Sequence, residues 1–197
     1  MTTLVIFGSA AALYALFWIW YVGFGRKVSP QLLEEVESVM AADDETLTDT
    51  HRHNIRHFLE NDNGKDFVMV NLLAIKKPRL ESLELLNKYA KIFLGDLLKR
   101  AGHPIAQARS AAGNIEFLNV PEADEWDVAM WVRYRSRTDF AEMIIETLGS
   151  EHHGLKLASL DRTFAFPASP WFVLGGPKLL VALVLALAAC VLHILLI

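Results

Sequence analysis

The two ends of the chain contain long runs without a charged residue, and these runs restrict the fold more than any other feature. No Asp, Glu, Lys or Arg occurs in 4–24, LVIFGSAAALYALFWIWYVGF, or in 179–197, LLVALVLALAACVLHILLI. About 20 apolar residues in a helix cross a hydrocarbon layer about 30 Å thick, and a helix satisfies its own backbone hydrogen bonds there. Each run therefore predicts a membrane-spanning helix.

Basic residues beside the two runs predict how the helices cross the membrane. Arg26 and Lys27 follow the first run, and Lys178 precedes the second. Because basic flanks stay on the cytoplasmic side, we expect both termini outside and the central part in the cytoplasm. A cleaved signal peptide would have a basic start and a shorter apolar run, so the first run is expected to be retained. These features predict a two-span protein of the bacterial inner membrane.

The central part of the chain carries its charge. The 19 Lys and Arg residues and 23 Asp and Glu residues give a net charge of −4, without a basic cluster. A mildly acidic balance offers no electrostatic footprint for nucleic acid, so no such partner is expected. The single cysteine, Cys190, lies in the second run. A body without cysteine suits a reducing compartment.

Patterned segments in the central part predict an α+β domain. Two short helices come first, one starting at Ser29 and Pro30 and one from about Leu47 to Glu60; we expect them to form a collar. The following segments read as strand DFVMVNLLAIKK, helix ESLELLNKYAKIFLGDLLKRAG, weaker strands in PIAQARSAAGNIEFLNV, strand WDVAMWVRY, a helix from Ser136, a short helix HGLKLASLD and edge strand RTFAFP. This β-α-β-β-α-β order is the ferredoxin-like arrangement. The expected parts are anchor 1–25, collar 26–65, ferredoxin-like domain 66–168, and elbow with second transmembrane helix 169–197.

Several of these segments resemble a known family. VNLLAIKK, the helix around Tyr89, WDVAMWVRYRSRTDFAEM and LKLASLDRTFAFP are similar to the small bacterial domain-of-unknown-function family in the dimeric α/β-barrel superfamily. The resemblance covers Asp66–Pro167 and implies two ferredoxin-like protomers packed sheet to sheet, and hence a homodimer. Arg135 stands where the family usually has proline, and Lys156 stands where arginine is usual. The superfamily contains cofactor-independent monooxygenases, lactone isomerases and haem-handling enzymes, so the resemblance selects no activity.

Strand alternation predicts a candidate ligand site between two paired sheets. In the first strand we expect Val68, Val70 and Leu72 against the helices and Asn71 on the opposite face. Four side chains would then converge on that opposite face: Asn71, Arg109, Trp131 and Arg133. Guanidinium forks, an indole face and an amide suit a planar anionic or phenolic ligand. The alternative is a dimer interface with internal salt bridges, in which Asp127 pairs with an arginine.

Histidines suggest a metal site in the collar. His53, His57 and Glu60 have i, i+4, i+7 spacing, which places them on one helical face where they could hold a transition metal. Arg52 and Arg56 are interleaved with them, and the alternative is a solvated or membrane-facing polar helix.

The second apolar run contains two further features. His193 lies about 15 residues, some 22 Å, beyond Lys178. An ionisable group in a span could ligate a haem or chlorin in a larger assembly, or reach the headgroups. Ala182, Ala186 and Ala189 form a small-residue stripe that would let another helix approach closely.

Two anchors exceed what is needed to tether one domain of about 100 residues, which favours membrane partners. The preferred hypothesis is an accessory or scaffold subunit of a larger inner-membrane complex, with a dimerising domain that has room for a small ligand. The alternative is a membrane-tethered cofactor-independent monooxygenase or isomerase acting on a lipophilic aromatic or quinone-like substrate. A metabolite sensor is a third hypothesis. Expected partners are the lipid bilayer and other membrane subunits, and the sequence predicts no particular cofactor.

Overall fold

The computed structural model describes residues 2–43, 46–116, 118–119, 125–148 and 150–196. The chain divides into two compact units. We call Met1–Phe24 with Pro170–Ile197 the helix pair, and Gly25–Ser169 the body. Each unit is described separately below.

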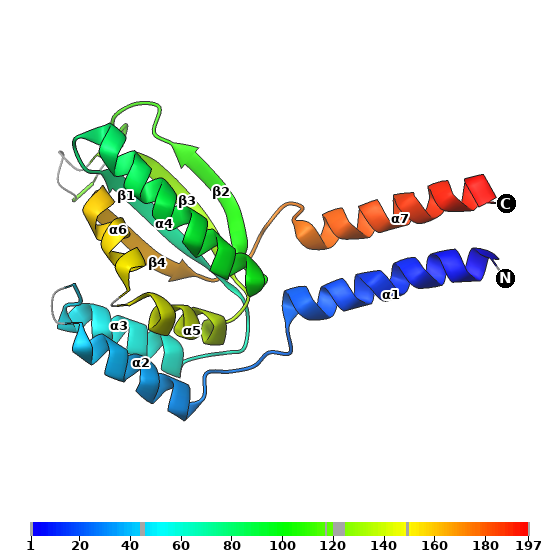
Figure 1. Ribbon diagram of the computed structural model, residues 1–197, viewed down its shortest axis with the longest axis horizontal. Helices are drawn as coiled ribbons and strands as arrows, with labels where there is room; N and C mark the ends of the chain where they lie inside the picture. Colours follow the sequence, from blue (N-terminus) through cyan, green and yellow to red (C-terminus); the bar gives the residue numbers. More distant parts are fainter. Residues whose placement is uncertain (1, 44–45, 117, 120–124, 149, 197) are drawn as a thin grey trace. The chain divides into compact units, whose positions relative to one another are not determined.

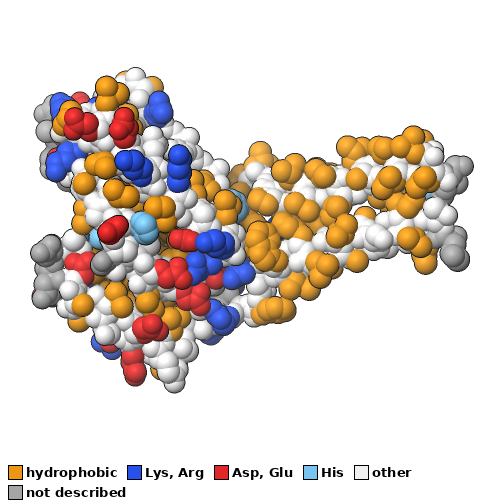
Figure 2. All heavy atoms as spheres, viewed as in Figure 1, with side chains coloured by type: hydrophobic (Ala, Val, Ile, Leu, Met, Phe, Trp, Pro, Cys, Tyr) orange, Lys and Arg blue, Asp and Glu red, His pale blue; other side chains and the backbone are white. Residues whose placement is uncertain are grey.

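The helix pair consists of α1 (Thr2–Val22) and α7 (Pro177–Leu196). Both helices are long and apolar enough to cross a membrane, as the uncharged runs predicted. Apolar side chains cover their surfaces in Figure 2. Such surfaces suit a hydrocarbon environment, in which helical backbone groups satisfy one another.

Contacts between α1 and α7 show that the two helices run in opposite directions. The Tyr14 hydroxyl donates to the Lys178 carbonyl over 3.3 Å, near the start of α7. The Phe7 ring lies 5.7 Å, centroid to centroid, from the His193 ring near the end of α7. Ala189, from the predicted small-residue stripe, is buried. The helix that approaches this part of the stripe is therefore α1 of the same chain.

The body is a mixed α+β unit with a four-stranded antiparallel sheet, which confirms the predicted class. The strands lie in the order β2-β3-β1-β4 (Figure 1). Their bounds are β1 (Phe67–Ile75), β2 (His103–Arg109), β3 (Val128–Tyr134) and β4 (Leu160–Ala168). Along the chain, a helix separates β1 from β2, and two helices separate β3 from β4.

The described part of the body also contains five helices. Their bounds are α2 (Pro30–Ala42), α3 (Asp49–Glu60), α4 (Arg79–Lys99), α5 (Arg137–Thr147) and α6 (Glu151–Ser159). Local caps explain where α2 and α5 begin, because Ser29 and Ser136 accept hydrogen bonds from the backbone amides of Leu32 and Asp139. Helices α4, α5 and α6 cover one face of the sheet (Figure 1).

The collar helices share a core with the rest of the body. Val36 and Met40 of α2 and Leu59 of α3 are buried with Ala141 and Ile144 of α5. Fully buried aliphatic side chains contribute roughly 1.5–3 kcal/mol each. The two collar helices are therefore part of the folded body and do not form a separate linker.

The faces of β1 are the reverse of those predicted. Phe67 and Leu73 pack against helices, and Asn71, two residues from Leu73, shares their side of the strand. The residues predicted on that side lie on the opposite face: Val68, Val70 and Leu72. Because β1 is apolar on both faces, alternation of hydrophobicity does not mark its inner side. In β3 the prediction is correct, with Val128 and Val132 packed in the clusters on the helix side.

Two successive small residues end α4. Ala101, with φ of 56°, adopts the left-handed conformation that glycine more often supplies. The Ala101 amide donates to Leu98 O over 3.0 Å and the Gly102 amide donates to Leu97 O over 2.9 Å, which is a Schellman motif. Glycine is needed at position 102 for space, since a Cβ there would lie 2.4 Å from Leu97 Cδ1.

Candidate functional site

A cavity of about 640 Å³ lies between the helices of the body and the helix-facing side of the sheet. This volume is within the range of small-molecule sites, roughly 300–1,000 Å³. Strand register places its sheet wall in three rows of side chains. The rows are Arg109, Val128, Leu73 and Thr163; Gln107, Met130, Asn71 and Ala165; and Pro104, Val132, Met69 and Pro167.

The wall opposite the sheet is largely apolar. Leu83, Leu86 and Phe93 of α4 and Leu157 of α6 line it, and Phe140 of α5 adds an aromatic ring. These side chains extend from a packed core into the cavity, because Leu83 and Leu86 also contact the buried cluster around β1. An apolar molecule placed there would lose its contact with water.

Two amides lie in the middle row of the sheet wall. Asn71 Nδ2 donates to the carbonyls of Met69 over 3.0 Å and Met130 over 3.4 Å. Within the described part of the chain, no residue donates to Asn71 Oδ1, which leaves an acceptor in the cavity wall. Gln107 of β2 lies in the same row, directly opposite Met130 of β3. The middle row can therefore orient a polar group of a ligand.

Two phenols line the cavity as neutral donors. Burial raises the pKa of Tyr89 to about 12. Burial also raises the pKa of Tyr134 well above its usual range, and the neighbouring Tyr89 adds to this effect. Since both phenols keep their protons at neutral pH, each offers an O–H donor to the cavity.

Helix α6 contributes two basic side chains to the cavity, His153 and Lys156. Burial lowers the pKa of Lys156. Burial and the Lys156 charge lower the pKa of His153, while Asp43 acts in the opposite sense. His153 Nε2 is buried and has no hydrogen-bond partner among the described residues. Among the described residues, no ion pair engages either side chain, and Asp43 is the carboxylate that acts on His153.

The structure divides the four predicted ligand residues between two faces of the sheet. Asn71 and Arg109 line the cavity. Trp131 and Arg133 pair with residues of the opposite face and point away from the helices. The structure therefore does not bring the four side chains together, because the inner and outer faces of both β1 and β2 are the reverse of those predicted.

Arg133 has a structural role. It is buried, its Nε lies 2.8 Å from Asp66 Oδ2, and its Nη1 donates to Ala101 O over 2.8 Å. These bonds tie the segment before β1 to the turn after α4. Asp127, the predicted partner of an arginine, pairs with Arg79 at 2.5 Å. The internal-salt-bridge alternative therefore describes Arg133 better than the ligand-site prediction does.

The face of the sheet that points away from α4, α5 and α6 carries exposed aromatic side chains. Trp131, Phe164 and Phe166 are 50%, 54% and 44% exposed. Register places Phe164 opposite Leu72 and Phe166 opposite Val70, so aliphatic side chains of β1 continue this apolar area. We call these residues the open face. Apolar areas of this kind mark interaction surfaces.

The predicted collar metal site does not form in the structure. The His53 and His57 rings stack 6.2 Å apart, while Glu60 accepts from Arg56 over 2.8 Å. Asn61 Nδ2 lies 3.2 Å from His57 Nδ1. No group of three or more His, Cys, Asp or Glu side chains within the described ranges is arranged to hold a metal. Arg56, which is interleaved with the histidines, binds the Glu60 carboxylate that a metal would need as a ligand.

His193 lies in the helix pair beside Phe7, as noted above. Its Nδ1 is buried without a hydrogen-bond partner in the part of the chain that the structure describes. Within these residues, Phe7 is the only aromatic side chain that contacts the His193 ring. The prediction that His193 ligates a cofactor stays a prediction.

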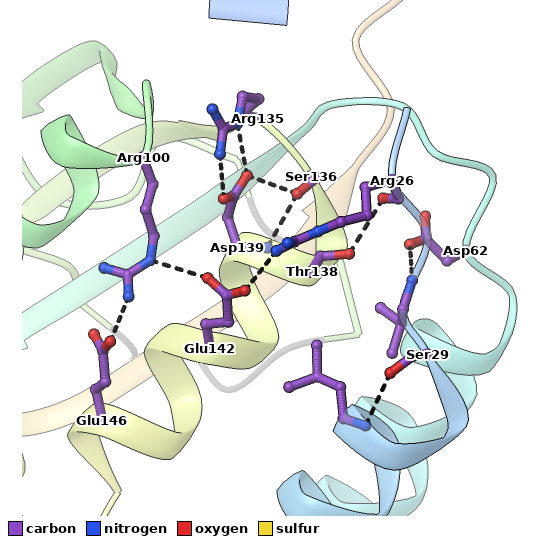
Figure 3. Close-up of polar contacts among 12 residues, drawn as sticks. Arg26, Ser29, Asp62, Arg100, Arg135, Ser136, Thr138, Asp139, Glu142 and Glu146 are labelled. Atoms are coloured by element: carbon purple, nitrogen blue, oxygen red, sulfur yellow. Dashed lines mark hydrogen bonds and ion pairs between the residues drawn. The ribbon is translucent and has the colours of Figure 1, made fainter. Parts of the chain in front are cut away.

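A network of charged side chains fixes the start of α5 (Figure 3). Arg135 contacts both oxygens of the buried Asp139, at 2.6 and 2.9 Å, and the Ser136 hydroxyl donates to the same carboxylate over 2.6 Å. Glu142, one turn further, pairs with Arg26 at 2.5 Å. These charges are compensated, so the network is structural. The network also gives Arg135 a structural role at the position where the family that the sequence resembles usually has proline.

Polar cavity residues outside the predicted ligand set include Tyr89, Gln107, His153 and Lys156. One signal could have found Lys156, which stands between Leu155 and Leu157 in an otherwise apolar stretch of a short helix. A lysine on the buried side of a helix is unusual unless it is paired or functional. Gln107 and Tyr89 carry no comparable signal, since both occur in ordinary amphipathic patterns.

Comparison with known proteins identifies the fold and no activity. No family model matches the chain, and no curated protein matches it. A crystal structure of a protein of unknown function from Rhodopseudomonas palustris matches with a TM-score of 0.51 and 18% identity, covering 64% of this chain and 96% of that chain. The methylated form of that protein matches with a TM-score of 0.51 and 19% identity, covering 64% and 93%. At this identity the likeness establishes a shared fold with an uncharacterised protein, which is consistent with a domain of unknown function.

Proposed function

We propose that this protein is a membrane-anchored accessory subunit whose body binds a small lipophilic ligand. The observation that carries the proposal is the cavity of about 640 Å³ between the helices and the sheet. Small-molecule sites are concave and mostly apolar, with a few polar groups that orient the ligand. Because the chain also has two helices able to cross a membrane, a membrane-soluble ligand suits both units.

The apolar wall and the polar groups of the cavity would make different contributions to ligand binding. The apolar side chains of α4 and α5 remove the body of the ligand from water, which supplies most of the binding free energy. The amides of Asn71 and Gln107 and the phenol of Tyr89 offer hydrogen bonds at defined positions. These polar groups supply orientation and selectivity.

The proposal includes a ferredoxin-like fold of the dimeric α/β-barrel type. The β-α-β-β-α-β order and the strand order β2-β3-β1-β4 support this assignment. The exposed aromatic residues of the open face support a homodimer that pairs through the sheet. Sheet pairing would leave the ligand cavity, on the other face, within each protomer.

The proposed location is the bacterial inner membrane, with two spans and the body in the cytoplasm. Arg26 and Lys27 after α1 and Lys178 at the start of α7 support this orientation. The largely exposed apolar surfaces of α1 and α7 are compatible with other membrane subunits as well as with lipid. Chains that co-purify in a fixed ratio after gentle extraction would identify the host complex.

We propose binding in preference to the oxygenase or isomerase hypothesis. That hypothesis needs Asn71, Arg109, Trp131 and Arg133 around one substrate, and these residues lie on two faces of the sheet. Arg133 is also engaged with Asp66 and Ala101. The cavity therefore supports recognition of a ligand more directly than any particular reaction.

Filling the cavity tests the proposal. Ala90 of α4 lines the cavity, so Ala90→Phe should occupy part of the ligand volume. The matched control is Ala158→Phe, which places the same side chain at an exposed position of α6. Full-length proteins are extracted in native lipid discs, and their bound small molecules are measured by native mass spectrometry.

The expected result is a small molecule bound to the wild type and to Ala158→Phe and lost from Ala90→Phe. Equal small-molecule content in the wild type and Ala90→Phe would contradict the proposal. Thermal unfolding of the three proteins distinguishes loss of the ligand from loss of the fold.

A further inference from the structure

We propose that α6 binds the acidic head of the ligand, and that the ligand is a single-chain amphiphile with a carboxylate. His153 and Lys156 would each donate to one carboxylate oxygen. The inference rests on the proposed function, since it assigns a chemical class to the molecule in the same cavity.

The geometry of α6 favours this arrangement. His153 and Lys156 are three residues apart, so their side chains lie on the same face of the helix. Both line the cavity. A carboxylate has two oxygens and accepts hydrogen bonds from two donors at once. One turn of α6 therefore provides a pair of donors matched to a single head group.

Among the described residues, no hydrogen bond or ion pair engages the Lys156 amine, and His153 Nε2 is buried without a partner. The carboxylate that influences His153 is Asp43, whose oxygens already accept from the Thr46 amide over 3.0 Å and its hydroxyl over 2.7 Å. Two half-buried basic groups that face one cavity without an ion-pair partner among the described residues favour an anionic ligand.

The rest of the cavity indicates what is attached to the anion. Leu83, Leu86 and Phe93 form an apolar wall on α4, which suits an aliphatic or aromatic chain. The amides in the middle row are neutral and would accept a single polar substituent. Two arginines also line the cavity, but Arg79 pairs with Asp127 and Arg109 is exposed on the edge strand β2. The half-buried pair on α6 is therefore the stronger anchor.

A photoreactive dodecanoic acid tests the assignment, with dodecanol bearing the same diazirine as the neutral probe. Full-length protein in lipid nanodiscs is labelled with each probe, competed with the unlabelled compound, and the modified peptides are identified by mass spectrometry. We expect the acid to label cavity residues and to bind about tenfold more tightly than the alcohol, the effect of one charge-assisted hydrogen bond.

Lys156→Met is the decisive variant, because methionine keeps the bulk of the side chain without its charge. It should weaken binding of the acid about tenfold and leave binding of the alcohol unchanged. Lys91→Met removes a charge from an exposed position of α4 outside the cavity and should change neither. Because methionine keeps the apolar stem of a half-buried lysine and removes an amine that has no ion-pair partner among the described residues, Lys156→Met should unfold at the same temperature as the wild type or higher. His153→Leu provides a second test of the same pair.

Three results would overturn the inference. If acid and alcohol label the cavity equally in the wild type and in Lys156→Met, the cavity binds ligand but α6 does not select an acid. If Arg109→Gln removes the preference for the acid and Lys156→Met does not, the head group lies at β2. Labelling of the cavity by neither probe would overturn the proposed function as well.

Discussion

Gly102 is a position at which one methyl group decides whether two elements fit together. A Cβ at this position would lie 2.4 Å from Leu97 Cδ1 and 2.8 Å from Arg133 O. The second of these atoms belongs to the backbone of β3 and cannot turn away. The close approach between the end of α4 and β3 therefore depends on the absence of a side chain.

We expect Gly102→Ala to lower the free energy of unfolding of the body by about 2 kcal/mol, a typical effect of overpacking. Gly95→Ala is the matched control, because a Cβ at Gly95 in the middle of α4 meets nothing within 4 Å. That control should raise stability by about 0.5–1 kcal/mol through helix propensity. Chemical denaturation followed by tryptophan fluorescence measures both, and equal effects would contradict the packing explanation.

Secondary structure could be predicted from local sequence, and the placement of site residues could not. The segment around Ser29 and the one around Ser136 carry their own caps, and β3 alternates clearly enough to mark its inner face. The inner face of β1 was assigned wrongly, because Val68, Met69, Val70 and Leu72 give an apolar side in both directions. The cavity depends on how far α4 and α6 stand from the sheet, a distance that no local pattern encodes.

Asp127 joins three elements of the body. Its Oδ2 accepts from the Ile75 amide at the end of β1 over 2.6 Å, and its Oδ1 pairs with Arg79 of α4 at 2.5 Å. Partial burial opposes ionisation of Asp127, but the Ile75 amide and Arg79, with a smaller effect of Lys77, lower its pKa overall. A carboxyl with a depressed folded-state pKa stabilises the fold above its unfolded pKa, and this stability is lost as pH falls through the folded value.

Asp127→Asn should therefore lower the free energy of unfolding by about 1 kcal/mol at neutral pH. The difference from the wild type should shrink as pH falls below about 4, where the wild-type carboxyl gains its proton. Asp161→Asn, at a largely exposed carboxylate, serves as the control and should have little effect. A difference between wild type and Asp127→Asn that is independent of pH would argue against the ionic contribution. Denaturant unfolding at a series of pH values provides the measurement.

At the scale of the whole molecule, the open face and the cavity lie on opposite sides of one sheet. The proposed assembly and the proposed ligand binding would therefore change independently. Trp131→Glu should convert the proposed homodimer into a monomer, because a carboxylate in the centre of an apolar interface loses its hydration. Leu98→Glu places the same charge on an exposed position of α4 and should leave the dimer intact. Native mass spectrometry measures the oligomeric state, and a wild-type monomer would contradict the dimer proposal.

The shared core of α2, α3 and α5 determines where the body can be cut. A fragment that starts at the first strand would lack Val36, Met40 and Leu59 and would present Ala141 and Ile144 to water. Fragments that expose apolar core residues in this way aggregate during expression. A fragment cut at Gly25 and Ser169 keeps those partners together, so the smallest piece worth producing without detergent includes about 40 residues that a sheet-based definition of the domain would discard.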